Sequence, residues 1–81
     1  MIDISEIAAF LEASLTVMGY QVRYDNKQSK ELIYLDVYNE DGMPECYLRI
    51  SDGDPEIKEL FNYVYIHNIE EAEAFLKTLD K

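Results

Sequence analysis

The spacing of apolar residues changes twice along this chain, and these changes limit the folds that it can adopt. In residues 3–18 apolar side chains recur every three or four positions, which is the period of a helix with one buried face. From Tyr20 to Ile50 they alternate with polar side chains, which is the period of a β-strand. After Pro55 the spacing of three and four returns. The sequence therefore predicts an α+β fold.

The first helix is predicted over residues 3–18. Asp3 is a typical N-cap residue, and Glu6 stands three positions later, as in a capping box. Gly19 follows the last apolar position, where a residue in the left-handed conformation commonly ends a helix.

Three strands are predicted next, over residues 20–25, 31–38 and 45–50. The turn between the last two contains Asp41 and Gly42, a strong hairpin signal. Strands joined by short turns pair antiparallel, so we expect a three-stranded antiparallel meander.

The remainder of the chain predicts two more helices. Asp54 is a good N-cap and Pro55 suits the first helical position. The last helix begins after Asn68, whose capping partner is Glu71, and it runs to Leu79. Residues 63–66 are compatible with a short fourth strand, because they are aromatic and β-branched. The expected order is α-β-β-β-α-α, in one domain over residues 1–81, with the helices packed on one face of the sheet.

Composition excludes several functions. Lys plus Arg is 7 and Asp plus Glu is 17, so the formal charge of the 81 residues is −10. Binding to nucleic acid or to an anionic membrane needs cations, so neither is expected. A single cysteine forms no internal disulfide. Since no signal peptide and no apolar run long enough to span a bilayer is found, a cytoplasmic location is expected.

Catalytic and metal-binding patterns are not found either. The chain has one cysteine, Cys46, and one histidine, His67. Alternation places Cys46 on the inward face of its strand, and one Cys with one His makes no familiar zinc site. Residues 52–56 do not match the calcium-loop pattern, and the three glycines form no phosphate loop. We therefore expect a protein that is not an enzyme and that uses no metal or cofactor.

Two features indicate a protein-binding surface. Acidic residues are concentrated between residues 39 and 59 and again at Glu70, Glu71 and Glu73. Alternation also places three tyrosines, a residue type enriched at interfaces, on the sheet face opposite the core; these are Tyr34, Tyr38 and Tyr47. Both features suit a basic protein partner. The other interpretation is that the acids solvate the surface and the tyrosines pack across strands.

Several segments carry a resemblance to a known family. These are YQVR at 20–23, VYNEDG at 37–42, YLRIS at 47–51, EIKELF at 56–61 and EEAEAF at 70–75. Over about two thirds of its length the chain resembles the small acidic phage-encoded anti-CRISPR proteins that inhibit the RNA-guided nuclease of type II systems.

The resemblance implies that carboxylates take the places of DNA phosphates and base acceptors in the nuclease. The residues that it implicates are a hairpin tip, Asn39, Glu40, Asp41 and Gly42, and the acids Glu70, Glu71 and Glu73 of the last helix. The chain departs from the family in its longer first helix, in Met43 and Pro44 at the tip, and in Ala72 and Ala74. Two alternatives remain: an immunity or regulatory protein that masks another basic partner, and an accessory phage domain whose acids serve solubility alone.

Overall fold

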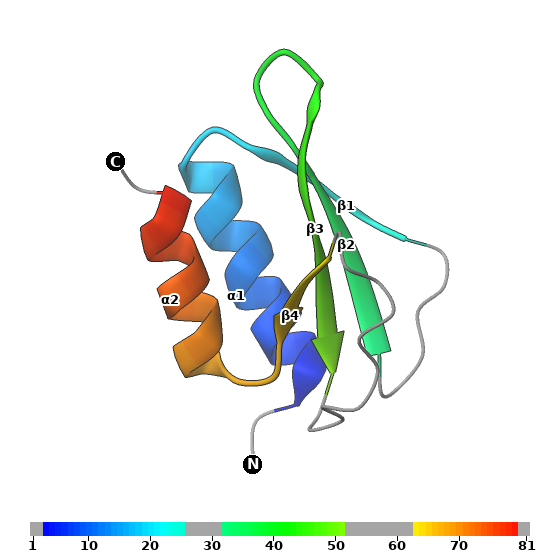
Figure 1. Cartoon of the computed structure of the whole chain (residues 1–81), viewed down its shortest axis with the longest axis vertical. Coiled ribbons are helices and arrows are strands. Elements are labelled where there is room, and N and C mark those ends of the chain that lie inside the picture. The colour runs from blue at the N-terminus through cyan, green and yellow to red at the C-terminus, as the bar shows by residue number, and fades with distance from the viewer. Residues whose placement is uncertain (1–2, 26–31, 52–62, 80–81) are drawn as a thin grey trace.

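Two helices and four strands make up the part of the chain that the computed structural model describes, which is residues 3–25, 32–51 and 63–79 (Figure 1). In chain order they are α1 (Ile4–Val17), β1 (Gln21–Tyr24), β2 (Leu32–Tyr38), β3 (Pro44–Ser51), β4 (Tyr63–Ile66) and α2 (Ile69–Leu79). The α+β class expected from the changing apolar period is confirmed.

The sheet has four strands in the order β1-β2-β3-β4. The first three pair antiparallel, as predicted, but β4 pairs with β3 in parallel, with Tyr47 opposite Tyr63 and Ile50 opposite Ile66. The prediction of a purely antiparallel three-stranded sheet was therefore wrong. Residues 63–66 form the short fourth strand with which the sequence was compatible. Their aromatic and β-branched side chains suit a pleated sheet. Val64 thus belongs to β4, whereas most of the helix predicted from Asp54 lies outside the described residues.

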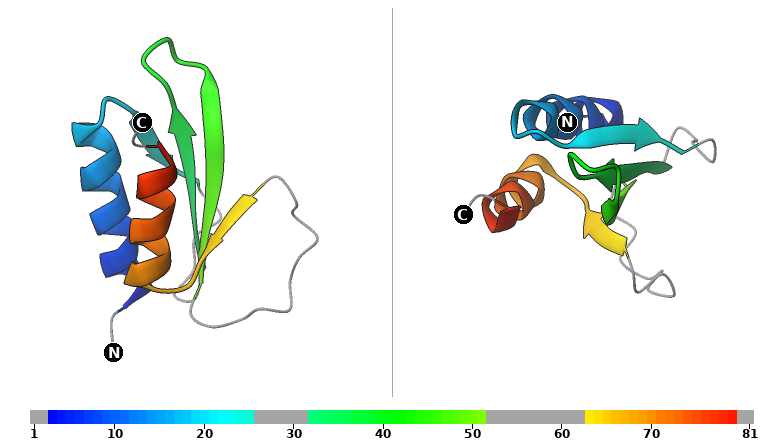
Figure 2. Two further views of the ribbon diagram at one scale, coloured as in Figure 1. Left: turned by 60° about the vertical axis from the view of Figure 1, so that its left-hand side comes forward. Right: turned by 90° about the horizontal axis from the view of Figure 1, so that it is seen from above.

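Both helices lie side by side on one face of the sheet (Figure 2). The core is the layer between them and the inward side chains of the strands. Leu11 and Leu15 of α1 belong to the same core cluster as Leu35 of β2 and Leu48 of β3, and all four are fully buried. Burial of apolar surface contributes about 25 cal/mol per Å² to the free energy of unfolding, so this layer is the main source of stability.

The ends of α1 agree only partly with the predicted caps. Asp3 occupies the N-cap position, but its side chain makes no capping hydrogen bond, and its backbone oxygen accepts from the N–H groups of Glu6 and Ile7. The C-terminal end matches the prediction: Gly19 has a φ of 101°, and the Tyr20 N–H donates to the carbonyl of Leu15 over 2.9 Å. This glycine turn directs the chain from α1 into β1.

Candidate functional site

The turn between β2 and β3 is held in place by Asn39. The side-chain oxygen of Asn39 accepts hydrogen bonds from the backbone N–H groups of Asp41, over 2.9 Å, and Met43, over 3.0 Å. Its backbone N–H donates to the Met43 carbonyl, and its carbonyl accepts from the Gly42 N–H. Gly42 has a φ of 81°, a conformation that favours glycine. Of the four predicted tip residues, Asn39 and Gly42 thus shape the turn, whereas the side chains of Glu40 and Asp41 are exposed.

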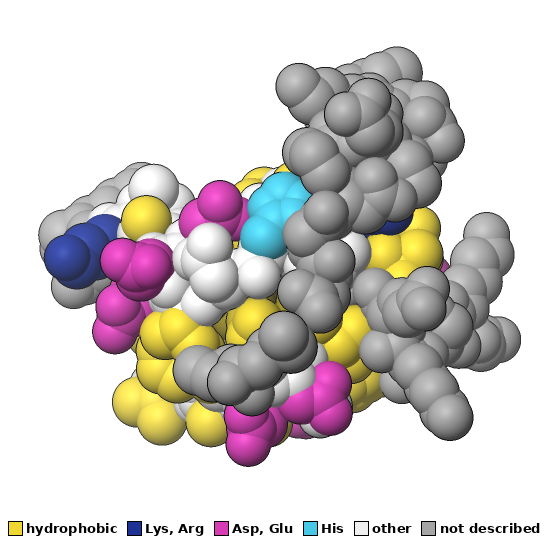
Figure 3. Space-filling model, turned by 90° about the horizontal axis from the view of Figure 1, so that it is seen from below, with side chains coloured by type: hydrophobic (Ala, Val, Ile, Leu, Met, Phe, Trp, Pro, Cys, Tyr) yellow, Lys and Arg dark blue, Asp and Glu magenta, His cyan; other side chains and the backbone are white. Residues whose placement is uncertain are grey.

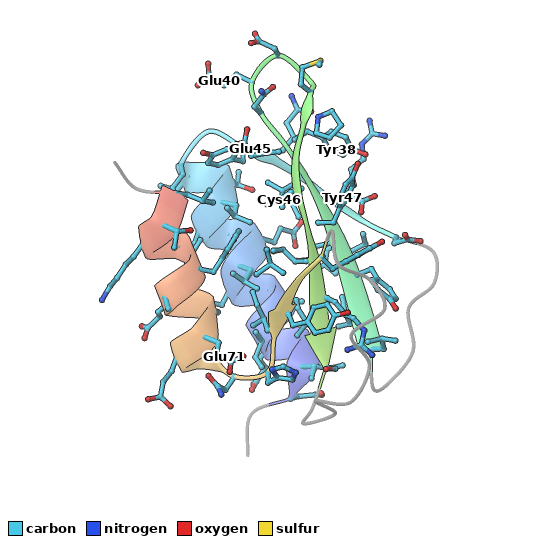
Figure 4. The ribbon with its side chains drawn as sticks, viewed as in Figure 1. Tyr38, Glu40, Glu45, Cys46, Tyr47 and Glu71 are labelled. Carbon is cyan, nitrogen blue, oxygen red and sulfur yellow. The ribbon has the colours of Figure 1, made fainter. Side chains whose placement is uncertain are left out.

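A β-bulge changes the direction of Glu45. Val37 lies opposite Cys46, but Tyr38 lies opposite Pro44, so Glu45 is the extra residue of β3. Simple alternation placed Glu45 on the outer face with Tyr47. Instead, Glu45 lines a polar hollow of about 290 Å³ between the hairpin and the end of α1, together with Met18, Gly19, Tyr20, Asn39, Glu40 and Asp41. The bulge therefore brings a third carboxylate to this end of the molecule (Figure 4).

Exposed apolar side chains gather at the same end. Val17 is 87% exposed and Met18 37% exposed where α1 finishes, and Met43 is 61% exposed at the tip. Glu40 lies against the end of α1, because its Oε1 is 3.2 Å from the place where a Cβ on Gly19 would be. We call this surface the hairpin end; its residues are Val17, Met18, Glu40, Asp41, Met43 and Glu45.

The carboxylates of the hairpin end are not neutralised locally. Within the described part of the chain, Glu40, Asp41 and Glu45 make no ion pair with a lysine or arginine. Their negative charges are therefore available to an external cation. The arrangement is a rigid turn that presents acids next to apolar surface, which suits a protein partner with basic and apolar groups.

Glu71 lies near the start of α2, away from Glu40 and the hairpin (Figure 4). Glu70, Glu71 and Glu73 are all exposed. Glu71 already has a local role: its Oε1 accepts from the His67 backbone N–H and lies 2.9 Å from His67 Nδ1. Its backbone N–H donates to the Asn68 side chain over 2.8 Å, which confirms the predicted cap. Glu71 thus has one carboxylate oxygen engaged locally. Of the acids predicted between residues 39 and 59, Glu40 and Glu45 lie apart from Glu71 (Figure 4), and those at 52–59 lie outside the described residues.

The predicted tyrosines lie on the outer face of the sheet. The ring of Tyr63 is 5.3 Å from that of Tyr34, edge to face, and 5.8 Å from that of Tyr47. The sequence assigned no role to Tyr63, because its strand was ambiguous, although Tyr63 and Tyr65 alternate with Val64 and Ile66 as outward residues do. Tyr38 is separate from this cluster and lies 5.8 Å from the guanidinium of Arg23. The tyrosines therefore pack across strands, as the alternative interpretation held, and partly cover one another.

Arg49 is the outer-face residue that sequence reasoning missed. It is only 2% exposed and lies between Tyr34 of β2 and Tyr65 of β4. Its guanidinium lies 5.3 Å from the Tyr65 ring, and Nη1 is 3.4 Å from Ser51 Oγ. Its Nε is buried without a hydrogen-bond partner, and no carboxylate among the described residues pairs with it. Among the described residues, the Arg49 guanidinium therefore has one hydroxyl acceptor and one aromatic ring as partners.

Asp36 on the same face has a raised pKa. Burial is the main cause, and the nearby charge of Asp25 adds to it. Arg23 lies opposite Asp36 in the strand register, yet its guanidinium turns toward the ring of Tyr38. The carboxylate of Asp36 is therefore held without a compensating cation from the described residues.

Cys46 and His67 have few of the features of catalytic groups. Burial, with a smaller contribution from Glu45, raises the pKa of the Cys46 thiol to about 11, so little thiolate forms near neutral pH. His67 is hydrogen-bonded to Glu71, and its Nε2 is buried without a partner.

Across residues 3–25, 32–51 and 63–79, no three His, Cys, Asp or Glu side chains are grouped so as to hold a metal ion. Neither α1 nor α2, the helices in that part of the chain, has the length and apolarity needed to cross a membrane.

Comparison of the chain with models of known protein families, with curated proteins and with solved structures finds no match. The resemblance to anti-CRISPR inhibitors therefore stays a prediction.

Proposed function

We propose that this protein is a non-enzymatic acidic inhibitor that binds a basic protein surface through its hairpin end. The observation that carries the proposal is the combination of three carboxylates and exposed Met43, at a hairpin whose turn is fixed by Asn39, with exposed Val17 at the end of α1. Because the turn is already ordered, less conformational entropy is lost on binding. Apolar contacts add affinity, and the acids select a cationic partner.

The partner that best fits this chemistry is the DNA-binding site of a nucleic-acid enzyme. Lysines and arginines that bind phosphates and guanine acceptors also bind carboxylates, arginine often through two hydrogen bonds. The resemblance to anti-CRISPR inhibitors points to an RNA-guided nuclease as the target, and to a phage protein that acts in the cytoplasm of its host. Glu70 and Glu73, both exposed on α2, would form a second, weaker contact.

A cleavage assay with a type II RNA-guided nuclease tests the proposal. The wild-type protein is expected to inhibit DNA cleavage, less strongly as salt is raised and as competing target DNA is added. The variant Glu40→Lys with Asp41→Lys should lose at least tenfold in inhibitory potency. The matched control, Glu70→Lys with Glu73→Lys, changes the net charge equally on α2 and should lose less.

The outcomes separate the alternatives. Full potency of the Glu40→Lys, Asp41→Lys protein would overturn the assignment of the hairpin end. If the wild-type protein leaves the nuclease fully active but binds another basic protein through Glu40 and Asp41, the immunity or regulatory interpretation replaces the nuclease. If neither charge reversal changes any interaction, the acids serve solubility.

A further inference from the structure

An apolar groove lies between α2 and the edge strand β4, away from the hairpin end. It has a volume of about 510 Å³, and its walls include Val64, His67, Glu71, Ala74, Phe75 and Thr78. This volume falls within the range of about 300–1,000 Å³ typical of ligand sites. Seen from below, His67 is visible at the surface beside acidic side chains (Figure 3).

The groove follows from the sequence of α2. Glu71, Ala74, Phe75 and Thr78 have the spacing of one helical face, and this face lies along β4. Phe75 is 8% exposed and also belongs to the core, so it joins the groove to the packed interior. Ala74 is exposed and too small to fill the space beside the four-residue strand β4. An apolar hollow is therefore left open to the exterior.

Among the described residues, the carboxylate in the wall of the groove is that of Glu71, which is fixed by the contacts with His67 and Asn68. Glu70 and Lys77 lie about one helical turn to either side of Ala74. No lysine or arginine is among the described residues that line the groove. In the contacts described, Glu71 uses only Oε1, which leaves Oε2 for a cation from outside. A second copy of this chain, with its net charge of −10, is an unsuitable occupant, because the two copies repel each other.

We propose that this groove binds an extended segment of a partner protein in which a bulky apolar side chain lies next to a lysine or arginine. The apolar side chain occupies the space over Val64, Ala74 and Phe75, and the cation reaches the carboxylate of Glu71. The site goes beyond the proposed inhibitory function, since it shares no residue with the hairpin end, and its Glu71 lies away from Glu40 (Figure 4). It needs no contact from the hairpin end.

A titration followed by NMR of the ¹⁵N-labelled full chain tests the site directly. The probe is the end-blocked peptide Phe-Arg-Leu-Lys, and the controls are Phe-Glu-Leu-Glu, which reverses the charge, and Ser-Arg-Ser-Lys, which removes the apolar side chains. We expect saturable shifts at Val64, Ala74 and Thr78 with the first peptide, and binding at least tenfold weaker with either control.

Ala74→Trp is the deciding variant, because it fills the groove from an exposed helical position. It should weaken binding of Phe-Arg-Leu-Lys at least tenfold while the rest of the spectrum is retained. Ala13→Trp, at an exposed position on α1, is the matched control and should bind like the wild type.

The proposal is overturned by absence of saturable shifts in the wild type, by equal binding of the acidic peptide or by undiminished binding to Ala74→Trp. It is also overturned if the shifts depend on protein concentration alone, which would identify a second copy as the occupant. The lysine variants of Glu40 and Asp41 should bind the peptide normally, so this result is independent of the inhibition assay.

Discussion

The two faces of the sheet are built from the same strands but have different packing. On the inner face, Leu35, Val37, Leu48 and Ile50 are fully buried under α1 and α2. On the outer face, tyrosine rings contact one another across strands, and the buried Arg49 lacks a carboxylate partner among the described residues. The inner face therefore carries most of the stability. The outer face includes groups whose replacement is expected to leave the free energy of unfolding unchanged or to raise it.

The largest effect is expected from Leu48→Ala on the inner face. Leu48 is fully buried in the centre of β3, and removing it loses apolar contacts and leaves a cavity. The free energy of unfolding should fall by about 2–5 kcal/mol. Chemical denaturation of the two proteins measures this change. Met43→Ala, at a side chain that is 61% exposed, is the control and should change the free energy of unfolding by less than about 0.5 kcal/mol.

Arg49→Met should have an effect of the opposite sign. The substitution keeps an unbranched side chain and removes a buried charge. It also removes the contact between the guanidinium and the Tyr65 ring. The free energy of unfolding is expected to stay equal or to rise by about 1–3 kcal/mol. Arg49→Lys should destabilise the protein, since an ammonium group is more strongly hydrated than a guanidinium. A clear loss of stability in Arg49→Met, by more than about 1 kcal/mol, would show that the guanidinium is compensated.

A smaller effect is expected from the ring contact between Tyr34 and Tyr63. Tyr34→Leu and Tyr63→Leu, made singly and together, should give a coupling energy of about 0.5–1.5 kcal/mol. Either single substitution already removes the edge-to-face contact, so the double variant loses less stability than the sum of the two single variants. Tyr38→Leu combined with Tyr63→Leu is the control pair and should show additive effects, since the ring of Tyr38 lies against Arg23 instead. Additivity in the first pair would mean that the two rings contribute only by covering surface.

The smallest effect concerns Asp36 and depends on pH. Its pKa is raised in the folded protein, so ionisation of Asp36 opposes folding. The protonated carboxyl group of Asp36 therefore favours folding. This stabilisation is fully present below the ordinary pKa of 3.8 and is lost as the pH rises through the raised pKa of the folded protein. Asp36→Asn should have a higher melting temperature than the wild type at pH 7, and this gain should disappear near pH 3. An equal gain at both values would assign the effect to packing instead of charge.

Local patterns predicted the elements better than their assembly. The helix at the start of the chain and the turn at Gly42 follow from period and turn chemistry, which depend on neighbouring residues alone. The parallel pairing of β4 with β3 depends on residues distant in the sequence, and so it was not predicted. The bulge at Glu45 was missed for a related reason, because a single extra residue in β3 reverses the direction that alternation assigns.

The candidate site shows the same division. The residue types at the hairpin tip were predicted as a binding surface. Their position beside Met18 and Gly19 depends on the end of α1 lying next to the turn, which the sequence did not predict. The three tyrosines were placed on the correct face by alternation, whereas Tyr63 joined them through a strand pairing.

The sequence by itself determined the α+β class, the inward side chains of the strands and the excess of negative charge, since period and composition are local properties of the chain. Only the tertiary structure decided that Glu40 lies away from Glu71, that Arg49 is buried and that a groove opens beside β4. These features depend on which surfaces meet when the helices cover the sheet, and no local pattern specifies that packing.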